Sequence, residues 1–290
     1  MKIEIKTIHS DYNGFDALAA VAMKSRDLVL ETLELDYSGC GFFEANMAAP
    51  LYAVLARSYD RLNTVELKGL KPAVETILRK NHFLTRFGFF QEQGWNQTTL
   101  PFKIFKLGAG EQFADYLERY MQGKGIPEMS KGLTKKFRQS LFEIFQNAAL
   151  HSQSEQGIFA CGQFFPGKKR VDFTIADAGI GIRQNVRKYL RNSKISSCKA
   201  IEWALEEGHT TKTGRQPGGL GLSLIKDFIS LNKGKIQITS RYGFYQFTHA
   251  GESIRKMDHD FPGTCVNIEI NTNDPHKYSL KSELRATDIF

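Results

Sequence analysis

One amphipathic stretch, Leu141–His151, constrains the fold of this 290-residue chain more than any other feature. Glu143, Asn147 and His151 follow one another at intervals of four, so a helix places them along one face. A carboxylate one turn from a carboxamide suits magnesium-phosphate chemistry, in which the amide oxygen ligates the ion and the carboxylate activates a nucleophile. Taken alone, the stretch is better explained as a solvated polar face, but the residues downstream reverse that preference.

The length and composition describe a globular chain with room for two domains. Hydrophobic and charged shares of 41% and 24% are ordinary for soluble proteins. No run approaches the roughly 18 apolar residues of a membrane span, and the opening Met-Lys-Ile-Glu-Ile-Lys alternates like a strand rather than a signal peptide. Because the four cysteines are far apart, we expect reduced thiols and a cytoplasmic protein without membrane contact.

The net charge of +8 is unevenly distributed along the chain. Residues 1–100 hold 11 basic and 12 acidic residues, whereas the remainder holds 28 and 19. A basic second half suits nucleotide phosphates, an acidic protein partner or nucleic acid. Nucleic acid ranks below the other two, because the basic residues are scattered and form no DNA-reading motif.

Strands and helices alternate over about the first 85 residues. This alternation predicts a small α/β sandwich. The expected strands are 1–9, Leu28–Asp36 and Asn63–Lys68, and the expected helices are 13–25, Glu44–Tyr59 and Pro72–Leu84.

This order of elements, with Leu-Asp-Tyr-Ser-Gly-Cys-Gly-Phe-Phe-Glu at residues 35–44, resembles a STAS domain, the fold of bacterial anti-anti-sigma factors. Those regulators typically carry Asp-Ser-Ser-Gly with a phosphorylatable serine, where this chain has Glu44-Ala45-Asn46-Met47. Ala45 has no hydroxyl group to accept phosphate. The resemblance therefore implies a docking or scaffolding module that phosphorylation cannot switch, and an unrelated α/β domain is the alternative.

An aromatic-rich stretch, residues 86–110, connects this unit to the rest of the chain. Its pattern predicts short strands or an ordered connection, followed by a helix over Glu111–Met121 and a break over Gly123–Pro127. We place the domain boundary near residue 108. The expected division is a STAS-like domain with its connector over 1–107, a second domain over 108–275, and a polar tail over 276–290 that is disordered or docks on a partner.

Two further strands, Gly157–Phe165 and Val171–Ala176, follow the opening helix and are joined by a Pro-Gly turn with three basic residues. The second strand ends in Asp177-Ala-Gly179-Ile-Gly181. A carboxylate at a strand end can accept a hydrogen bond from the adenine amino group, and the glycines allow the backbone to approach the base. Because guanine presents a carbonyl there, this arrangement favours adenine.

Residues 183–217 are expected to form a lid, with eight basic residues against three acidic ones. Within them, Thr211 and Lys212 offer a hydroxyl group and a cation near the phosphates. A solvated loop with surplus charge is the alternative.

A glycine block, Gly218-Gly219-Leu220-Gly221-Leu222, then leads into an expected helix over Ser223–Leu231. Glycines before a helix leave N–H groups aimed at an anion. The block is not a P-loop, because the Gly-Lys-Ser/Thr ending is absent, and the order of elements excludes a Rossmann fingerprint. Closing strands are expected over Lys235–Ser240 and Thr264–Ile270.

Four sequence blocks in this order resemble the GHKL superfamily, which includes gyrase-type ATPases, histidine-kinase catalytic domains and anti-sigma serine kinases. The resemblance spans about residues 125–272 and implies a Bergerat-type α/β sandwich that binds ATP between helices and a mixed sheet. The blocks are Glu143 with Asn147, then Asp177 with Gly179 and Gly181, then Gly218–Leu222, then Gly263-Thr264.

The resemblance also implies roles for these residues. Asn147 would ligate magnesium, Glu143 would be the general base, and Asp177 would contact adenine with support from Thr264. The glycine block would cradle the phosphates. The Glu-x-x-x-Asn-Ala-x-x-His pattern, which ends at His151, is closest to the anti-sigma kinase variant and adds His151 to the ATP-binding residues.

Two functions follow from this interpretation. The first is an ATP-dependent regulatory protein, either a serine/threonine protein kinase or a slow ATPase of anti-sigma type, that acts with a protein partner. The alternative is a non-catalytic switch in which ATP closes the lid and creates a surface for the partner. A sensor histidine kinase is disfavoured, since no helical hairpin with an exposed histidine precedes residue 130. The phosphate acceptor and a homodimer are left open.

Overall fold

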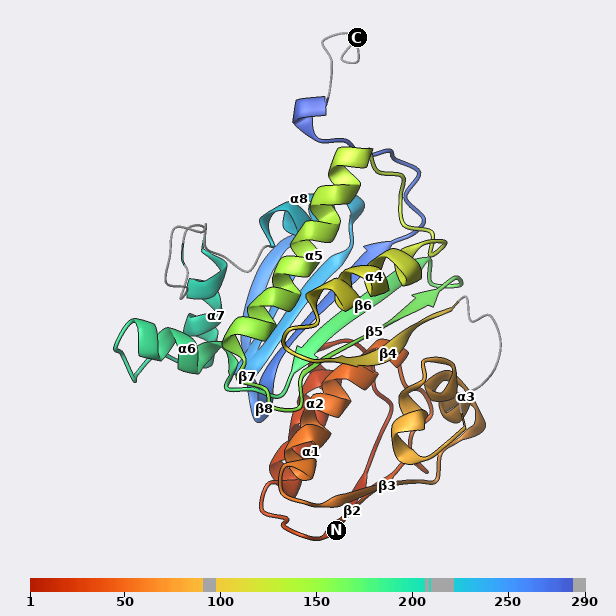
Figure 1. Ribbon diagram of the computed structural model, residues 1–290, viewed down its shortest axis with the longest axis vertical. Helices are drawn as coiled ribbons and strands as arrows, with labels where there is room; N and C mark the ends of the chain where they lie inside the picture. Colours follow the sequence, from red (N-terminus) through yellow and green to blue (C-terminus); the bar gives the residue numbers. More distant parts are fainter. Residues whose placement is uncertain (91–97, 207–208, 210–221, 284–290) are drawn as a thin grey trace.

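The computed structural model describes the chain except residues 91–97, 207–208, 210–221 and 284–290. Its described residues form two sheets, one of three strands and one of five (Figure 1). The α/β fold class expected from the sequence is confirmed. No helix in the described parts of the chain is long and apolar enough to cross a membrane.

The N-terminal unit is a parallel three-stranded sheet in the order β1-β2-β3. The register pairs Lys2 with Glu34 and Thr32 with Thr64. The Asp11 side chain caps the first helix by accepting a hydrogen bond from the Gly14 N–H at 2.8 Å. The elements are β1 (Lys2–Glu4), α1 (Tyr12–Ser25), β2 (Thr32–Asp36), η1 (Ala45–Met47), α2 (Ala48–Tyr59), β3 (Thr64–Lys68), α3 (Pro72–Lys80) and η2 (Phe83–Phe87).

Several predicted elements of this unit are shorter than expected. The strand expected over 1–9 ends at Glu4, and the helix expected from Glu44 starts at Ala48, after a 3-10 helix over Ala45–Met47. The strand expected from Leu28 begins at Thr32, because Leu30 takes a left-handed backbone conformation with a φ of 58° that no strand accommodates. The helix expected to reach Leu84 ends at Lys80, and His82 with a φ of 63° turns the chain into a separate 3-10 helix.

The second sheet is antiparallel throughout, in the order β4-β5-β6-β8-β7. Helices α4, α5 and α8 cover one of its faces, and α6 and α7 lie beside the β7 edge (Figure 1). Its strands are β4 (Thr99–Phe105), β5 (Ile158–Phe165), β6 (Arg170–Asp177), β7 (Lys235–Thr248) and β8 (Gly251–Asn271). The helices are α4 (Gly110–Met121), α5 (Lys131–His151), α6 (Gly181–Tyr189), α7 (Ser197–Leu205), α8 (Ser223–Asn232) and the short η3 (Lys281–Glu283).

The second sheet differs from the expectation in two places. Strand β4 pairs with β5, so this sheet begins at Thr99, before the boundary predicted near residue 108. Strands β7 and β8 continue past the predicted ends Ser240 and Thr264 into a long hairpin that closes at Thr248 and Gly251. Polar and apolar residues alternate along this hairpin, and Phe244 packs against Tyr12 and Phe15 of α1.

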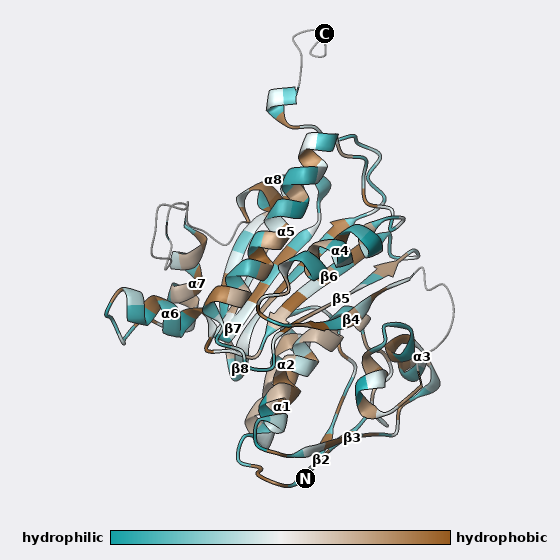
Figure 2. Ribbon diagram, in the orientation of Figure 1, coloured by the Kyte–Doolittle hydropathy of each residue, from teal (hydrophilic) through white to brown (hydrophobic). Residues whose placement is uncertain are grey.

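The five-stranded sheet is buried on both faces. On the helical side, the Phe113 ring stacks on Phe145 with centroids 4.3 Å apart and meets Phe105 edge-on at 5.4 Å. On the other side, the α2 residue Tyr52 meets Phe159 of β5 at 4.9 Å. Figure 2 shows apolar segments on the helices and the sheet where these layers meet. The N-terminal unit therefore shares one buried core with the second sheet.

Arg170 links the two units at the centre of this buried contact. Its guanidinium lies 2.6 Å from Glu44, 2.8 Å from Glu269 and 3.1 Å from Asp172, the last without the geometry of a hydrogen bond. Glu44 is 1% exposed and also accepts a hydrogen bond from the Ser10 N–H at 2.9 Å. Arg170 therefore bridges three carboxylates, one of them from the N-terminal unit. Lys168 also lies 3.6 Å from Glu44, and Lys235 lies 3.1 Å from Glu269.

Replacing Arg170 by alanine is expected to destabilise the protein by about 3–5 kcal/mol, because it removes the ion-pair partner of the buried Asp172 and the nearest cation of Glu44 and Glu269. Chemical denaturation followed by circular dichroism would measure this change. Arg170→Lys is the matched control, since it keeps the charge and should retain part of the stability. A loss below about 1 kcal/mol in Arg170→Ala would show that the network contributes little to folding.

The described part of the tail packs against the start of α5. The Glu283 carboxylate accepts hydrogen bonds from the Ser130 hydroxyl and, at 3.1 Å, from the Gly132 N–H. Tyr278 contacts Phe228 with ring centroids 5.1 Å apart. These contacts place residues 272–283 on the protein's own surface, and the remainder of the predicted tail lies outside the described residues.

Candidate nucleotide-binding site

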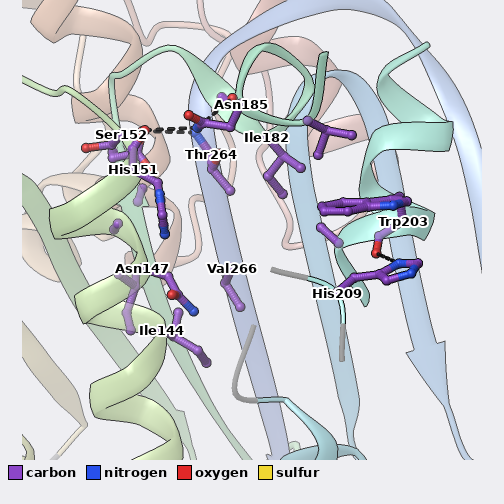
Figure 3. A pocket seen from close by; sticks show the side chains of 17 residues that line it. Ile144, Asn147, His151, Ser152, Ile182, Asn185, Trp203, His209, Thr264 and Val266 are labelled. Carbon is purple, nitrogen blue, oxygen red and sulfur yellow. Dashed lines mark hydrogen bonds between the residues drawn. The ribbon is translucent and has the colours of Figure 1, made fainter. Parts of the chain in front are cut away.

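A cleft lies between α5, the adjoining strands β6 and β8, and helices α6 and α7 (Figure 3). Its empty volume, counted to the open mouth, is about 790 Å³. Most lining groups are apolar, with a few polar side chains among them. Ile144, Val186 and Val266 form part of the apolar lining, and Asn147, Asp177 and Thr264 supply polar groups. This composition suits a flat, mostly apolar ligand that is oriented by few hydrogen bonds.

Asp177 ends strand β6 at the floor of the cleft and is 3% exposed. Its Oδ1 atom accepts hydrogen bonds from the N–H groups of Gly179 at 2.9 Å and Thr264 at 3.3 Å. Oδ1 accepts both of these hydrogen bonds from the described residues. The other carboxylate oxygen, Oδ2, can therefore accept a hydrogen bond from a ligand. Burial raises the Asp177 pKa to about 7, against the lowering effects of both hydrogen bonds and the Arg57 charge.

The loop after Asp177 requires glycine at Gly179. A Cβ there would lie 1.8 Å from the Ser152 carbonyl oxygen, a backbone atom that cannot move aside. Ser152 also accepts a hydrogen bond from the Ile180 N–H at 2.8 Å, so the loop is tied to the end of α5. The Gly179 carbonyl in turn accepts a hydrogen bond from Arg57 of α2 at 2.9 Å. The N-terminal unit therefore supports the loop directly.

Replacing Gly179 by alanine is expected to weaken ATP binding by at least tenfold and to lower the melting temperature. The added methyl group must push the loop away from Ser152 and so moves the Gly179 N–H away from the Asp177 carboxylate. Calorimetry with ATP and magnesium, together with thermal denaturation, would measure both effects. Gly167→Ala in the β5–β6 turn is the control, since no atom lies within 4 Å of a Cβ there. Unchanged ATP affinity in Gly179→Ala would contradict the assignment of this loop to the base site.

Helix α5 forms the opposite wall of the cleft. Asn147 and His151 line it, one turn apart, as the helical spacing predicted (Figure 3). Glu143 is one turn earlier, half-buried, and its Oε1 atom accepts a hydrogen bond from Gln139 at 3.4 Å. Glu143 is not among the described residues that line the cleft. The structure thus brings Asn147, His151, Asp177, Gly181 and Thr264 together and places Glu143 beside them.

The comparison with protein families agrees with this geometry. Residues 132–274 match the family model of histidine kinase-, DNA gyrase B-, and HSP90-like ATPases. This segment is similar to the GHKL ATPase domains that the family model describes. A search of curated proteins found no match to the chain. The GHKL resemblance expected from the sequence is therefore confirmed for the segment that forms the cleft, and ATP is its expected ligand.

Two side chains that the sequence did not predict as site residues connect the elements around the cleft. Asn185 of α6 donates a hydrogen bond to the His151 carbonyl at 2.9 Å, which ties α6 to the end of α5. Ser240 accepts a hydrogen bond from the Ile182 N–H at 2.9 Å and lies 3.0 Å from the Thr264 hydroxyl. Each is a single polar residue in an otherwise ordinary helix or strand, so no local sequence signal marks it.

An aromatic pair lies on the side of the cleft that α7 forms. Trp203 of α7 stacks on His209, with ring centroids 4.7 Å apart and an interplanar angle of 16° (Figure 3). Both residues line the cleft. The sequence predicted only a basic lid over residues 183–217. The structure shows that two short helices, α6 and α7, occupy the first part of this segment.

Several predicted site residues lie outside the described residues. They are Thr211, Lys212, Gly218, Gly219, Leu220 and Gly221. Leu222 is described and is 4% exposed, at the start of α8, where it packs in the core under the helices. Its side chain therefore contributes to the packing of α8.

Proposed function

We propose that this protein binds Mg-ATP in the cleft between α5 and strand β6, with adenine against Asp177. The observation that carries this proposal is the buried Asp177 carboxylate, which is held by Gly179 and Thr264 and opens into an apolar cleft. Its ionised form accepts a hydrogen bond from the adenine amino group, whereas guanine presents a carbonyl that the carboxylate repels. The match of residues 132–274 to an ATPase family supports this choice.

The donor set of the cleft fits a magnesium ion that is held mainly by phosphates and water. In the described parts of the chain no three His, Cys, Asp or Glu side chains are grouped to hold a metal. Mg²⁺ commonly keeps several waters and takes few protein ligands, so one amide oxygen is sufficient. Asn147 would hold the ion, and the ion would offset negative charge on the phosphates. The residues near the phosphates would include His151, Thr211, Lys212 and the block Gly218–Leu222.

We further propose that the protein turns ATP over, either by hydrolysis or by phosphorylating a regulatory protein partner, as the anti-sigma serine kinases do. Glu143 lies one helical turn from Asn147 and is the carboxylate available to accept a proton from water or from a partner's hydroxyl. A cytoplasmic location is part of this proposal, and the presence of a homodimer is left open.

Glu143→Ala is expected to lower the rate of phosphate release or transfer by about 10²–10⁴-fold, the usual contribution of a general base. ATP affinity should stay within about threefold of the wild type, since Glu143 does not line the described cleft. Released phosphate and phosphorylation of added cell proteins would be measured in parallel. Gln139→Ala, which removes the hydrogen-bond partner of Glu143, is the matched control and should retain most turnover.

A non-catalytic switch is the second candidate, and the position of Glu143 outside the described cleft lining favours it. In that case wild type and Glu143→Ala would bind ATP equally and neither would release phosphate. Partner binding would then depend on ATP alone.

The N-terminal unit enters the proposal as a STAS-like scaffold. Ala45, at the position that would carry the phosphorylated serine, is fully buried. Its N–H donates to Gln163 of β5 at 2.5 Å, and its carbonyl accepts from Asn81 at 2.9 Å. This site faces the second sheet, so the scaffold has neither the hydroxyl group nor the access that phosphorylation requires.

A further inference from the structure

A second cavity lies on the opposite side of the Asp177–Gly181 loop from the nucleotide cleft. Helices α1 and α2 contribute one wall, and Ile180, the start of α6 and the β7–β8 hairpin contribute the other. Its empty volume, counted to its open mouth, is about 1180 Å³. Ile180 lines this cavity whereas Gly181 lines the nucleotide cleft, so the same loop separates the two.

The side chains that line this second cavity carry an excess of positive charge. Arginines reach it from three separate parts of the chain: the end of α1, helix α2 with the residues after it, and strand β7. The lining arginines are Arg26, Arg57, Arg61 and Arg241, and the lining acids are Asp60 and Asp260.

Ion pairs neutralise only some of these arginines: Arg26 lies 3.2 Å from Asp27, which does not line the cavity. Asp260 pairs with Arg241, while Asp60 accepts a hydrogen bond from Gln156 at 2.7 Å. Arg57 donates to a carbonyl, that of Gly179, and the Arg61 side chain has no hydrogen bond or ion pair with any described residue. At least two guanidinium groups at this cavity therefore have no carboxylate partner among the described residues.

The charges lie close enough to influence one another. Burial lowers the pKa of Arg241, and the nearby charges of Arg183 and Arg57 lower it further, against the opposing effect of Asp260. A buried Asp260 oxygen, Oδ1, has no hydrogen-bond partner among the described residues. Clustered arginines with an unused acceptor beside them suit a ligand that carries both an anionic group and a donor.

We propose that this cavity binds a small phosphorylated ligand, with its phosphates on Arg57, Arg61 and Arg241. Guanidinium groups match phosphate oxygens in paired hydrogen bonds, which makes arginine the residue of choice for such anions. The cavity is large enough for more than one phosphate group. This site is additional to the nucleotide cleft and does not depend on ATP binding there.

The ligand would also affect the nucleotide cleft, and this part rests on the proposed ATP function. Arg57 bonds the Gly179 carbonyl, and Gly179 donates to Asp177. A phosphate that draws Arg57 away from Gly179 would loosen the base site, and ATP would in turn weaken binding of the phosphate by the same factor.

Calorimetric titration of the full chain with inorganic pyrophosphate tests this site. The nucleotide cleft is first saturated with adenylyl imidodiphosphate, so that pyrophosphate cannot bind there. We expect binding to persist, and Arg61→Ala to weaken it by about tenfold or more, the usual effect of losing a hydrogen bond to a charged group. Arg119→Ala, an exposed arginine on α4, is the matched control and should leave the affinity unchanged.

Arg61→Ala should fold normally, since its side chain is exposed and makes no bond with a described residue, and circular dichroism would check this. The proposal is wrong if pyrophosphate gives no heat, or if its affinity is the same in wild type and folded Arg61→Ala. A chain that fails to bind ATP but binds pyrophosphate through Arg61 would refute the proposed function and support this site.

Discussion

Replacing Asp177 by asparagine is expected to reduce ATP affinity by at least 100-fold without unfolding the protein. Asparagine keeps an oxygen that can accept the hydrogen bonds from Gly179 and Thr264. Its amide nitrogen, however, presents N–H groups where the adenine amino group also donates. Two donors then face each other in a buried cleft, and leaving them unpaired costs about 1–3 kcal/mol beyond the hydrogen bond that is lost. Calorimetry with ATP and magnesium measures the change.

Asp172→Asn is a suitable control for this variant. Asp172 lies on the same strand and is fully buried, but it faces the Arg170 network rather than the cleft. We expect its ATP affinity to stay within about threefold of the wild type. ATP binding that survives in Asp177→Asn would exclude this carboxylate as the adenine contact.

The raised pKa of Asp177 has a consequence for stability: Asp177→Asn should bind ATP more weakly and yet be more stable than the wild type at high pH. The pKa of Asp177 is about 7 in the folded protein, against 3.8 for the ordinary group. Between these two pH values the folded state holds a proton on Asp177 that the unfolded state has lost. The free energy of unfolding therefore falls as the pH rises from about 4 to 7. Asp177→Asn lacks this loss and should be more stable than wild type above pH 7, by about 1–3 kcal/mol. Thermal denaturation at pH 5 and pH 8 would test the sign.

ATP binding should remove the proton from Asp177. Since only the ionised carboxylate accepts the adenine hydrogen bond, ATP affinity should fall as the pH drops below about 7, by at most tenfold per unit. Calorimetry in two buffers of different ionisation enthalpy would detect the proton released on binding. A constant affinity between pH 5.5 and 8 would mean that Asp177 is already ionised in the free protein.

Much of the site could be predicted because its chemistry is local in sequence. The helical spacing of Asn147 and His151 places them on one wall, and the strand-turn pattern around Asp177 and Gly179 places the carboxylate on the floor. These periodicities depend only on backbone geometry. Asn185 and Ser240 were missed because their hydrogen bonds join elements that are distant in sequence, and no spacing rule reports such contacts.

The arrangement of the two units could not be predicted for a related reason. Strand β4 joins the second sheet only through pairing with β5, which follows it by more than fifty residues. Likewise, a strand that is buried on both faces appears in the sequence as a run of apolar residues. Such a run does not indicate which part of the chain covers each face. The prediction of two domains with a boundary near residue 108 therefore missed that the first unit completes the core of the second.

Removing the N-terminal unit is consequently expected to prevent the GHKL segment from folding as a stable monomer. A chain that begins at residue 99 retains β4 but exposes the sheet face that α1 and α2 cover. Each large apolar side chain left in water forfeits about 1.5–3 kcal/mol, so several together are comparable with the roughly 5–15 kcal/mol stability of an ordinary domain. The exposed set includes Phe159, Cys161, Phe244, Met257, Phe261 and Cys265. Solubility, size-exclusion chromatography and near-ultraviolet circular dichroism would report the outcome.

Co-expression of residues 1–90 with residues 99–290 separates loss of the covering layer from loss of chain continuity. The two fragments keep the Tyr52–Phe159 contact and the Glu44–Arg170 ion pair, so they should assemble into a soluble complex that binds ATP. Arg170→Ala in the longer fragment should weaken this assembly, because it removes the nearest cation of the buried Glu44 and leaves only Lys168, 3.6 Å away. If residues 99–290 alone gave a monomer that unfolds cooperatively and binds ATP, the covering layer would be dispensable. The N-terminal unit would then be a separate docking domain, as the sequence first indicated.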